Sequence, residues 1–150
     1  MKKSQDFITS ITVEQSAEDV FNAVNNVRGW WSQEIDGDTD KPGAEFKFHY
    51  KDLHFSTQRI TEFVPGKKVV WHVADSRINF VEDKAEWTGT DIVFEIARKG
   101  GKTELRFTHV GLVPAVECHE ACSDAWSFYV NTSLRSLIET GEGQPESKEG

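Results

Sequence analysis

The segment PAVECHEACSDAWSFYVNTSLRSLIETGEGQ, residues 114–144, carries small or apolar side chains at intervals of three and four. This spacing places them on one face of an α-helix. Gly141 is typical of the residue that ends a helix. A helix of about 24 residues rises about 36 Å, so it can cross several strands. The segment predicts a long C-terminal helix that covers a sheet, with an apolar face made of Ala115, Cys118, Cys122, Ala125, Trp126, Tyr129, Val130, Ser133, Leu134, Leu137 and Ile138.

Segments that alternate apolar and polar residues precede this helix along most of the chain. Alternation with a period of two, in segments rich in β-branched and aromatic residues, is typical of β-strands. Turn signals at Lys51-Asp52, Pro65-Gly66-Lys67 and Gly100-Gly101 indicate antiparallel pairing of neighbouring segments. We expect six or seven antiparallel strands, with a less regular stretch at 75–89 and the clearest strands at 7–13, 45–50, 53–63, 69–73, 92–97 and 103–109.

A short helix is expected after the first strand. Ser16 is a typical N-cap residue, and Asp19 follows it by three residues in a weaker form of the capping box. Apolar residues between 20 and 27 repeat at helical spacing, and the helix should end near residues 28–29. Residues 33–43 are acidic and rich in turn formers, which predicts a solvent-facing loop. This order of elements is typical of the α+β class with an antiparallel sheet.

Length and composition predict one globular domain. A chain of 150 residues with 37% hydrophobic content is able to bury a single core. We expect one domain over residues 1–150, with its core at about 7–141 and a polar tail at 142–150. The net charge of -8 opposes binding to nucleic acid. The chain starts with polar residues and has no long apolar run, so neither a signal peptide nor a membrane span is expected, and a cytoplasmic location follows.

Several short motifs resemble one known family when they are taken in order along the chain. They resemble the START-related SRPBCC superfamily, in the branch named after the activator of the heat-shock-protein-90 ATPase (AHSA-type), and within it a bacterial subgroup. The resemblance extends from about Phe7 to Pro145. The motifs are Ala17-Glu18-Asp19-Val20-Phe21, Trp30-Trp31, residues 59–67, residues 101–105, Thr108-His109-Val110-Gly111 and residues 133–141.

The resemblance implies a helix-grip (START/Bet v-like) fold, in which a curved antiparallel sheet wraps the C-terminal helix and leaves a deep, largely apolar pocket between them. Members of the superfamily include lipid and hormone carriers, aromatase/cyclase enzymes and co-chaperone domains, so the resemblance specifies the fold more than the chemistry. The eukaryotic co-chaperone also carries an N-terminal domain that binds the chaperone. This chain has no counterpart of that domain, so chaperone activation is not the expected role.

Cys118 and Cys122 are the most specific candidates for a metal-binding or redox site. They are four residues apart, so on a helix they share one face, with His119 about a quarter-turn away. Two thiolates and an imidazole could bind a soft metal, but a structural zinc site needs a fourth ligand from elsewhere in the chain. Cysteine is also among the most buried residue types. We expect core packing rather than metal or redox chemistry, and we expect no cofactor.

The sequence lacks the common catalytic and phosphate-binding motifs, including G-x-S-x-G, the P-loop, G-x-G-x-x-G and H-E-x-x-H. None of the five histidines stands beside a nucleophile in a recognisable constellation. His72 and His109 fall on predicted strands, where a hydrogen-bonded role in the sheet is the ordinary expectation. Enzymatic activity is therefore not the expected function.

Aromatic residues are spread over every predicted element. Most of them should be core, but a pocket between helix and sheet would be lined by the same residue types. The same inward-facing side chains cannot both fill the space and leave it open. The sequence is compatible with either an open cavity or a filled core. The residues expected to line a ligand cavity are Trp30, Trp31, Phe46, Phe48, Trp71, Val73, Phe94, Phe107, Trp126 and Tyr129.

These observations favour the non-catalytic binding of a small hydrophobic or amphipathic molecule between the sheet and the C-terminal helix. One alternative is a protein-interaction or chaperone-associated module, whose partner would be another protein. The other is a cyclase- or hydratase-type enzyme, which would need a polar dyad inside the cavity.

Overall fold

The computed structural model describes residues 7–32, 35–50, 54–78, 87–112 and 119–144, and its strands form one antiparallel sheet. The strand order is β1-β7-β6-β5-β4-β3-β2, so the first strand of the chain pairs with the last. This arrangement confirms the predicted antiparallel sheet of six or seven strands. The strands are β1 (Phe7–Val13), β2 (Ile35–Gly37), β3 (Glu45–Tyr50), β4 (His54–Val64), β5 (Lys68–Ile78), β6 (Asp91–Lys99) and β7 (Lys102–Val110).

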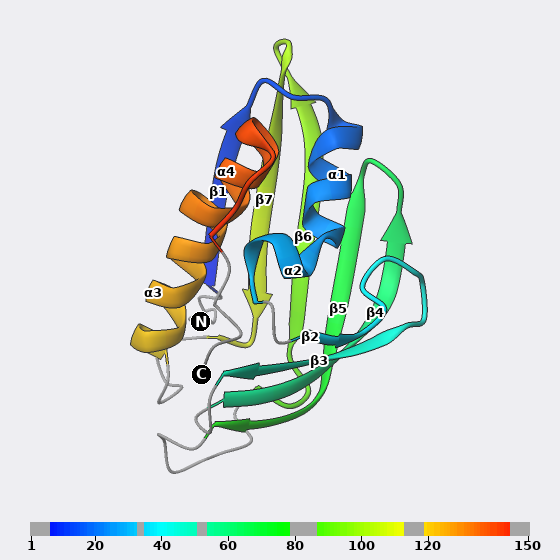
Figure 1. The fold of residues 1–150 in the computed structure, drawn as a ribbon, viewed down its shortest axis with the longest axis vertical. Helices are drawn as coiled ribbons and strands as arrows, with labels where there is room; N and C mark the ends of the chain where they lie inside the picture. The colour runs from blue at the N-terminus through cyan, green and yellow to red at the C-terminus, as the bar shows by residue number, and fades with distance from the viewer. Residues whose placement is uncertain (1–6, 33–34, 51–53, 79–86, 113–118, 145–150) are drawn as a thin grey trace, which may run out of the picture.

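The helices lie together on one face of this sheet (Figure 1). Two short helices, α1 (Ala17–Asn25) and α2 (Val27–Trp30), follow β1. The C-terminal helix consists of α3 (His119–Phe128), the π-helical η1 (Tyr129–Leu134) and α4 (Arg135–Thr140) in direct succession. Within the described residues, no helix is long and apolar enough to cross a membrane.

The C-terminal helix confirms the predicted amphipathic pattern. Its buried residues recur at intervals of three and four and are Cys122, Trp126, Val130, Ser133, Leu134 and Ile138. Gly141 ends it in the left-handed region, with φ of 89°, and donates its N–H to the carbonyl of Leu137. Two details differ from the prediction, because Ala125 is exposed and the turn at η1 is π-helical. The predicted start at residues 114–118 lies outside the described residues.

The predicted first helix is divided in two at Asn26. Ser16 caps α1 as expected, and its hydroxyl accepts a hydrogen bond from the N–H of Asp19 at 3.1 Å. Asn26 leaves the helical conformation, with φ of -88° and ψ of 67°, and α2 restarts in a new direction. Helical spacing of apolar residues cannot reveal such a break, because both pieces bury a similar face. The change of direction places Trp30 and Trp31 in the interior.

The predicted loop at residues 33–43 contains a strand, which corrects the sequence interpretation. The three residues of β2 pair with β3 at the edge of the sheet, and Ile35 is buried. Arg28 holds this strand in place, because its guanidinium donates to the carbonyls of Ile35 and Gly37. A three-residue strand among aspartate and glycine is too short to show a period of two.

Strands β4 and β5 bend where their pairing is irregular. The register shifts beside Ala74 of β5 and beside Thr61 of β4, each of which is an extra residue. Such bulges bend a strand and increase its twist. Beyond Ala74, β5 continues to Ile78, although the sequence predicted irregular structure from Asp75. The bent ends carry β3 and β2 across the lower end of the molecule in Figure 1.

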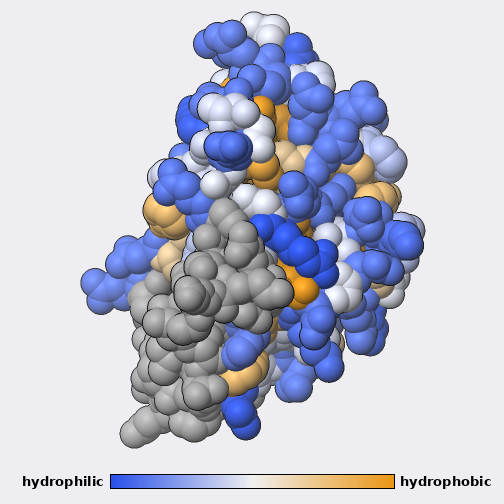
Figure 2. Space-filling view, in the orientation of Figure 1, coloured by the Kyte–Doolittle hydropathy of each residue, from blue (hydrophilic) through white to orange (hydrophobic). Residues whose placement is uncertain are grey.

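The core lies between the helices and the sheet. Each strand presents alternate residues to it, as the buried positions Val69, Trp71 and Val73 of β5 show. On the face shown in Figure 2, the coloured surface is mostly polar, with apolar residues in small separate patches.

Candidate functional site

Nine of the ten residues predicted to line a cavity are buried between sheet and helices, with exposed fractions of 0–4%. Their rings contact one another. Trp31 stacks on Phe48, with centroids 4.1 Å apart and planes 10° apart, and its centroid is 5.0 Å from that of Trp126. The structure therefore joins most of the predicted residues in one aromatic cluster, defined here as Trp30, Trp31, Phe46, Phe48, Trp71, Phe94, Phe107 and Trp126.

Two of the ten predicted residues do not belong to this cluster of rings. Val73 is fully buried on β5, next to the cluster. Tyr129 is half-buried at the start of η1, where its ring meets the exposed Phe128 edge-on at 5.4 Å. That these ten residues bind a ligand stays a prediction.

A chain of hydrogen bonds borders the aromatic cluster at the helix. The indole N–H of Trp126 donates to Nδ1 of His109 at 3.1 Å, and Nε2 of His109 lies 2.9 Å from the hydroxyl of Thr90. That hydroxyl donates to the carbonyl of Trp87 at 2.6 Å, so it must accept from His109. The arrangement assigns the proton of a neutral imidazole to Nε2. His109 thus has the hydrogen-bonded sheet role that the sequence predicted.

Among the buried side-chain polar atoms that have no hydrogen-bond partner in the described residues, three lie on strands beside the aromatic cluster. They are Oγ of Ser56, Oε1 of Gln58 and Nε1 of Trp71. Ser56 and Gln58 occupy successive inward positions of β4, where they pair with Phe48 and Phe46. Trp71 stands on the neighbouring strand β5, opposite Ile60. An unsatisfied buried polar atom costs about 1–3 kcal/mol, so three of them beside one aromatic cluster need an explanation.

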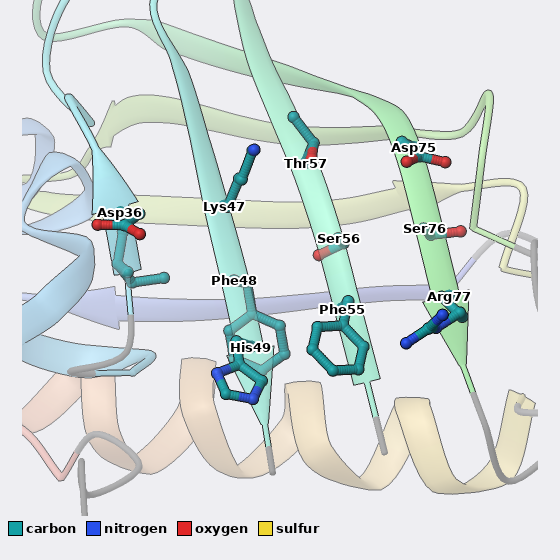
Figure 3. Close-up of a pocket in the computed structure, with 11 residues that line it drawn as sticks. Asp36, Lys47, Phe48, His49, Phe55, Ser56, Thr57, Asp75, Ser76 and Arg77 are labelled. Carbon is teal, nitrogen blue, oxygen red and sulfur yellow. The ribbon is translucent and has the colours of Figure 1, made fainter. Parts of the chain in front are cut away.

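A separate pocket of about 530 Å³ lies on the other face of the same strands. We call it the outer pocket (Figure 3). Most of its side chains come from the outward positions of β2 to β5 and include the rings of His49 and Phe55 and charges of both signs, while Ile35, Phe48, Ser56 and Ser76 are buried residues at inward positions of the same strands. The lining residues are Ile35, Asp36, Lys47, Phe48, His49, Phe55, Ser56, Thr57, Asp75, Ser76 and Arg77.

Three side chains of the outer pocket form a row across neighbouring strands. His49 pairs with Phe55, and Phe55 pairs with Arg77. The rings of His49 and Phe55 stack with centroids 4.8 Å apart and planes 12° apart. The guanidinium carbon of Arg77 is 5.1 Å from the centroid of the Phe55 ring. These contacts give the pocket a row of three planar groups, which we call the planar row.

Sequence reasoning missed the outer pocket except for Phe48. Most of its lining residues occupy the polar phase of the alternation, where solvent exposure is the ordinary expectation. One signal was present, because Phe55 is an aromatic residue in that polar phase. The predicted hairpin at Lys51-Asp52 would also have placed His49 opposite Phe55, but the pocket itself depends on the bend of β4 and β5.

The remaining candidates from the sequence are the two cysteines and His72. Cys122 is buried on α3, in agreement with core packing, while Cys118 lies outside the described residues. Nδ1 of His72 lies 2.8 Å from a carboxylate oxygen of Asp91 on the outer face. Within the described ranges, no three histidine, cysteine or acidic side chains converge in a way that could hold a metal ion.

The curved sheet and the C-terminal helix that packs into it define a helix-grip protein. A family model for activator of Hsp90 ATPase homolog 1-like proteins matches residues 14–139, so the chain belongs to this family. The family predicted from the motifs is therefore confirmed. A comparison with curated proteins finds no significant match.

Solved structures share the fold at low sequence identity. The Aha1 dimer from Colwellia psychrerythraea has a TM-score of 0.74 and 23% identity, covering 93% of this chain and 99% of that one. DynU16, described as a putative protein in the dynemicin biosynthetic locus, has a TM-score of 0.69 and 14% identity over 94% of this chain and 49% of that one. A protein from Staphylococcus saprophyticus has a TM-score of 0.66 and 16% identity over 93% of this chain and 96% of that one.

Proposed function

We propose that this protein binds a small amphipathic molecule between the sheet and the C-terminal helix and releases it unchanged. The observation that supports this function is the set of three unpartnered polar atoms, from Ser56, Gln58 and Trp71, beside the aromatic cluster. In a filled apolar core, such unpartnered polar atoms would only lower the stability of the fold. A site that holds an apolar body and a few polar groups does need them, because they fix the orientation of its ligand.

The three atoms also define the polar end of the ligand. Oε1 of Gln58 accepts a hydrogen bond, Nε1 of Trp71 donates one, and the hydroxyl of Ser56 does either. A ligand hydroxyl or amide can satisfy such a mixed set, whereas a carboxylate would be left facing the carbonyl oxygen of Gln58. The expected ligand therefore has an apolar body and an uncharged polar end.

The stack of Trp31 on Phe48 marks the place where the ligand inserts. Phe48 is the cross-strand partner of Ser56, so this stack lies directly beside an unpartnered hydroxyl. A ligand ring that enters here would exchange one aromatic contact for another while it gains hydrogen bonds. The π-helical turn η1 in the covering helix is consistent with this role, since π turns occur frequently at functional sites.

The first experiment looks for the ligand itself. Native mass spectrometry of gently purified protein should detect a retained cellular compound. A thermal-shift screen of fatty alcohols, sterols, flavonoids and aromatic polyketides should find a saturable stabiliser. A ligand that binds only the folded state at one hundred times its Kd stabilises it by about 2.7 kcal/mol. The absence of both a retained compound and a stabiliser would contradict the proposal.

The second experiment changes the polar end of the site. Gln58→Leu should weaken the stabiliser found in the screen by about tenfold, because one ligand hydrogen bond is lost. The unliganded variant should keep its stability within about 1 kcal/mol, since an unsatisfied oxygen is removed with the amide. Thr61→Ala, on the outward side of the same strand, is the matched control and should bind as the wild type does. Equal binding by Gln58→Leu would remove the support for this site.

A second candidate function is a protein-interaction module. The family description favours it, because it names an activator of the Hsp90 ATPase, and one structural neighbour is described as an Aha1 dimer. Stoichiometric recovery of a chaperone in pull-downs, together with no small-molecule stabiliser, would favour this function over ligand binding.

A further inference from the structure

The outer pocket combines the planar row with a second row of polar side chains. Pairing across the sheet aligns Asp36 with Lys47, Lys47 with Thr57, and Thr57 with Asp75. We call these four side chains the polar row. In Figure 3 it lies parallel to the planar row of His49, Phe55 and Arg77, one step further along the same strands. The extra residue Ala74 sits next to the polar row, at the point where β5 bends.

The charged side chains of the pocket have no ion-pair partner among the described residues. Asp36, Lys47, Asp75 and Arg77 line the pocket, and their side chains form no ion pair or hydrogen bond with another described residue. Elsewhere on the sheet, exposed charges do find partners, as Arg59 does with Glu45 at 3.1 Å. Two negative and two positive charges cancel, so the pocket presents donors and acceptors without selecting a net charge.

The planar row favours a flat ligand. An imidazole, a phenyl ring and a guanidinium are all side-chain groups on which flat rings stack. Stacking on such groups, combined with hydrogen bonds to the edge of a ring, is how proteins recognise nucleobase-like rings. The volume of about 530 Å³ falls in the range of small-molecule pockets, about 300–1,000 Å³.

We propose that the outer pocket binds a small, uncharged, planar nitrogen heterocycle. Its ring stacks on the planar row, while its polar edge meets neighbouring side chains of the polar row: an N–H group donates to Asp75, and a carbonyl oxygen accepts from Thr57 or Lys47. Polymeric nucleic acid does not fit, because the chain carries a net charge of -8 and the pocket adds no positive charge to offset it. The ligand is a free heterocycle or its nucleoside.

The two rows of this site face away from the proposed interior site, although Phe48 and Ser56 border both. The side chains of its two rows point away from the aromatic cluster, because they occupy the opposite phase of the strand alternation. Gln58→Leu should leave binding to the outer pocket unchanged. A negative result for the interior site would therefore not contradict binding in the outer pocket, and the reverse also holds.

The test uses riboflavin and guanosine as probes, with naphthol as a flat control that lacks the polar edge. NMR titration should show saturable amide shifts at residues 47–49, 55–57 and 75–77 with either probe at concentrations below about 1 mM, the level of a weak specific complex. Naphthol should bind at least tenfold more weakly. The proposal is overturned if neither probe gives saturable shifts there, or if naphthol binds as well as the probes.

Matched variants test the stacking. Phe55→Leu keeps apolar bulk but loses the ring, and it should weaken the probes by about tenfold or more, the scale expected for one stacking aromatic. Arg77→Lys keeps the charge but loses the planar group and should weaken them several-fold. Arg106→Lys, an exposed residue on β7 outside the pocket, should have no effect. Unchanged binding in both Phe55→Leu and Arg77→Lys overturns the proposal.

Discussion

The two faces of strands β3, β4 and β5 differ more than their sequences suggest. On the inner face, Phe48 and Trp71 have exposed fractions of 4% and 0% and stack into the aromatic cluster. On the outer face, Phe55 is half-buried and lies among charges. One alternating strand thus builds two environments, because successive side chains point to opposite sides of a sheet. Side chains of the inner face should contribute most to the free energy of unfolding, and those of the outer face should contribute little.

The largest loss of stability is expected for Trp126, where the C-terminal helix packs on the aromatic cluster. Trp126 is 2% exposed and donates its indole N–H to His109. Trp126→Ala should lower the free energy of unfolding by about 3–5 kcal/mol, because a large buried ring leaves a cavity. Denaturant unfolding measures this loss. Phe128→Ala, at a position 42% exposed on the same helix, is the control and should change it by less than about 1 kcal/mol. Similar losses for the two variants would contradict the helix-grip packing.

A pair of phenylalanines tests the comparison directly. Phe48 and Phe55 stand on neighbouring strands but on opposite faces. Phe48→Ala should cost about 3 kcal/mol, because its ring stacks on Trp31 inside the core. Phe55→Ala should cost about 1 kcal/mol, because its ring is already partly hydrated. Denaturation midpoints at equal m-values provide the measurement. Equal costs would show that the outer pocket is part of the structural core.

The hydrogen-bond chain at His109 gives a smaller effect. Thr90→Val removes the hydroxyl that accepts from Nε2 of His109, so this buried hydrogen bond is lost. The free energy of unfolding should fall by about 2 kcal/mol. Thr108→Val, a half-buried position on the adjacent strand, should have little effect. Imidazole ¹⁵N shifts should show the proton of His109 on Nε2 in the wild type, and a proton on Nδ1 would refute the assigned direction of this chain.

The smallest effect is expected for Cys122, which is buried on helix α3. Cys122 is 5% exposed, and Cys122→Ala should cost about 1 kcal/mol because only one sulfur atom is removed from the core. Elemental analysis should find the same metal content in the wild type and the variant. Stoichiometric zinc that disappears with the substitution would replace core packing by a metal site.

The sequence predicted the fold well because the signals for its main elements are local. Alternation with a period of two identified the long strands, and helical spacing from residue 122 to residue 138 identified the covering helix. The same signals predicted nine residues that the structure places together in the interior. Local signals failed at Asn26, where the helix breaks, and at β2, which is too short to show a period.

The sequence by itself determined which residues face inward, because burial follows the period of each element. Only the tertiary structure decided what those residues do there. Whether an aromatic ring packs on another ring or lines a cavity depends on distances such as the 4.1 Å between Trp31 and Phe48, which involve residues far apart in the chain. The outer pocket likewise exists because bulges bend β4 and β5, and the pairing register of four strands then aligns side chains that no local pattern connects.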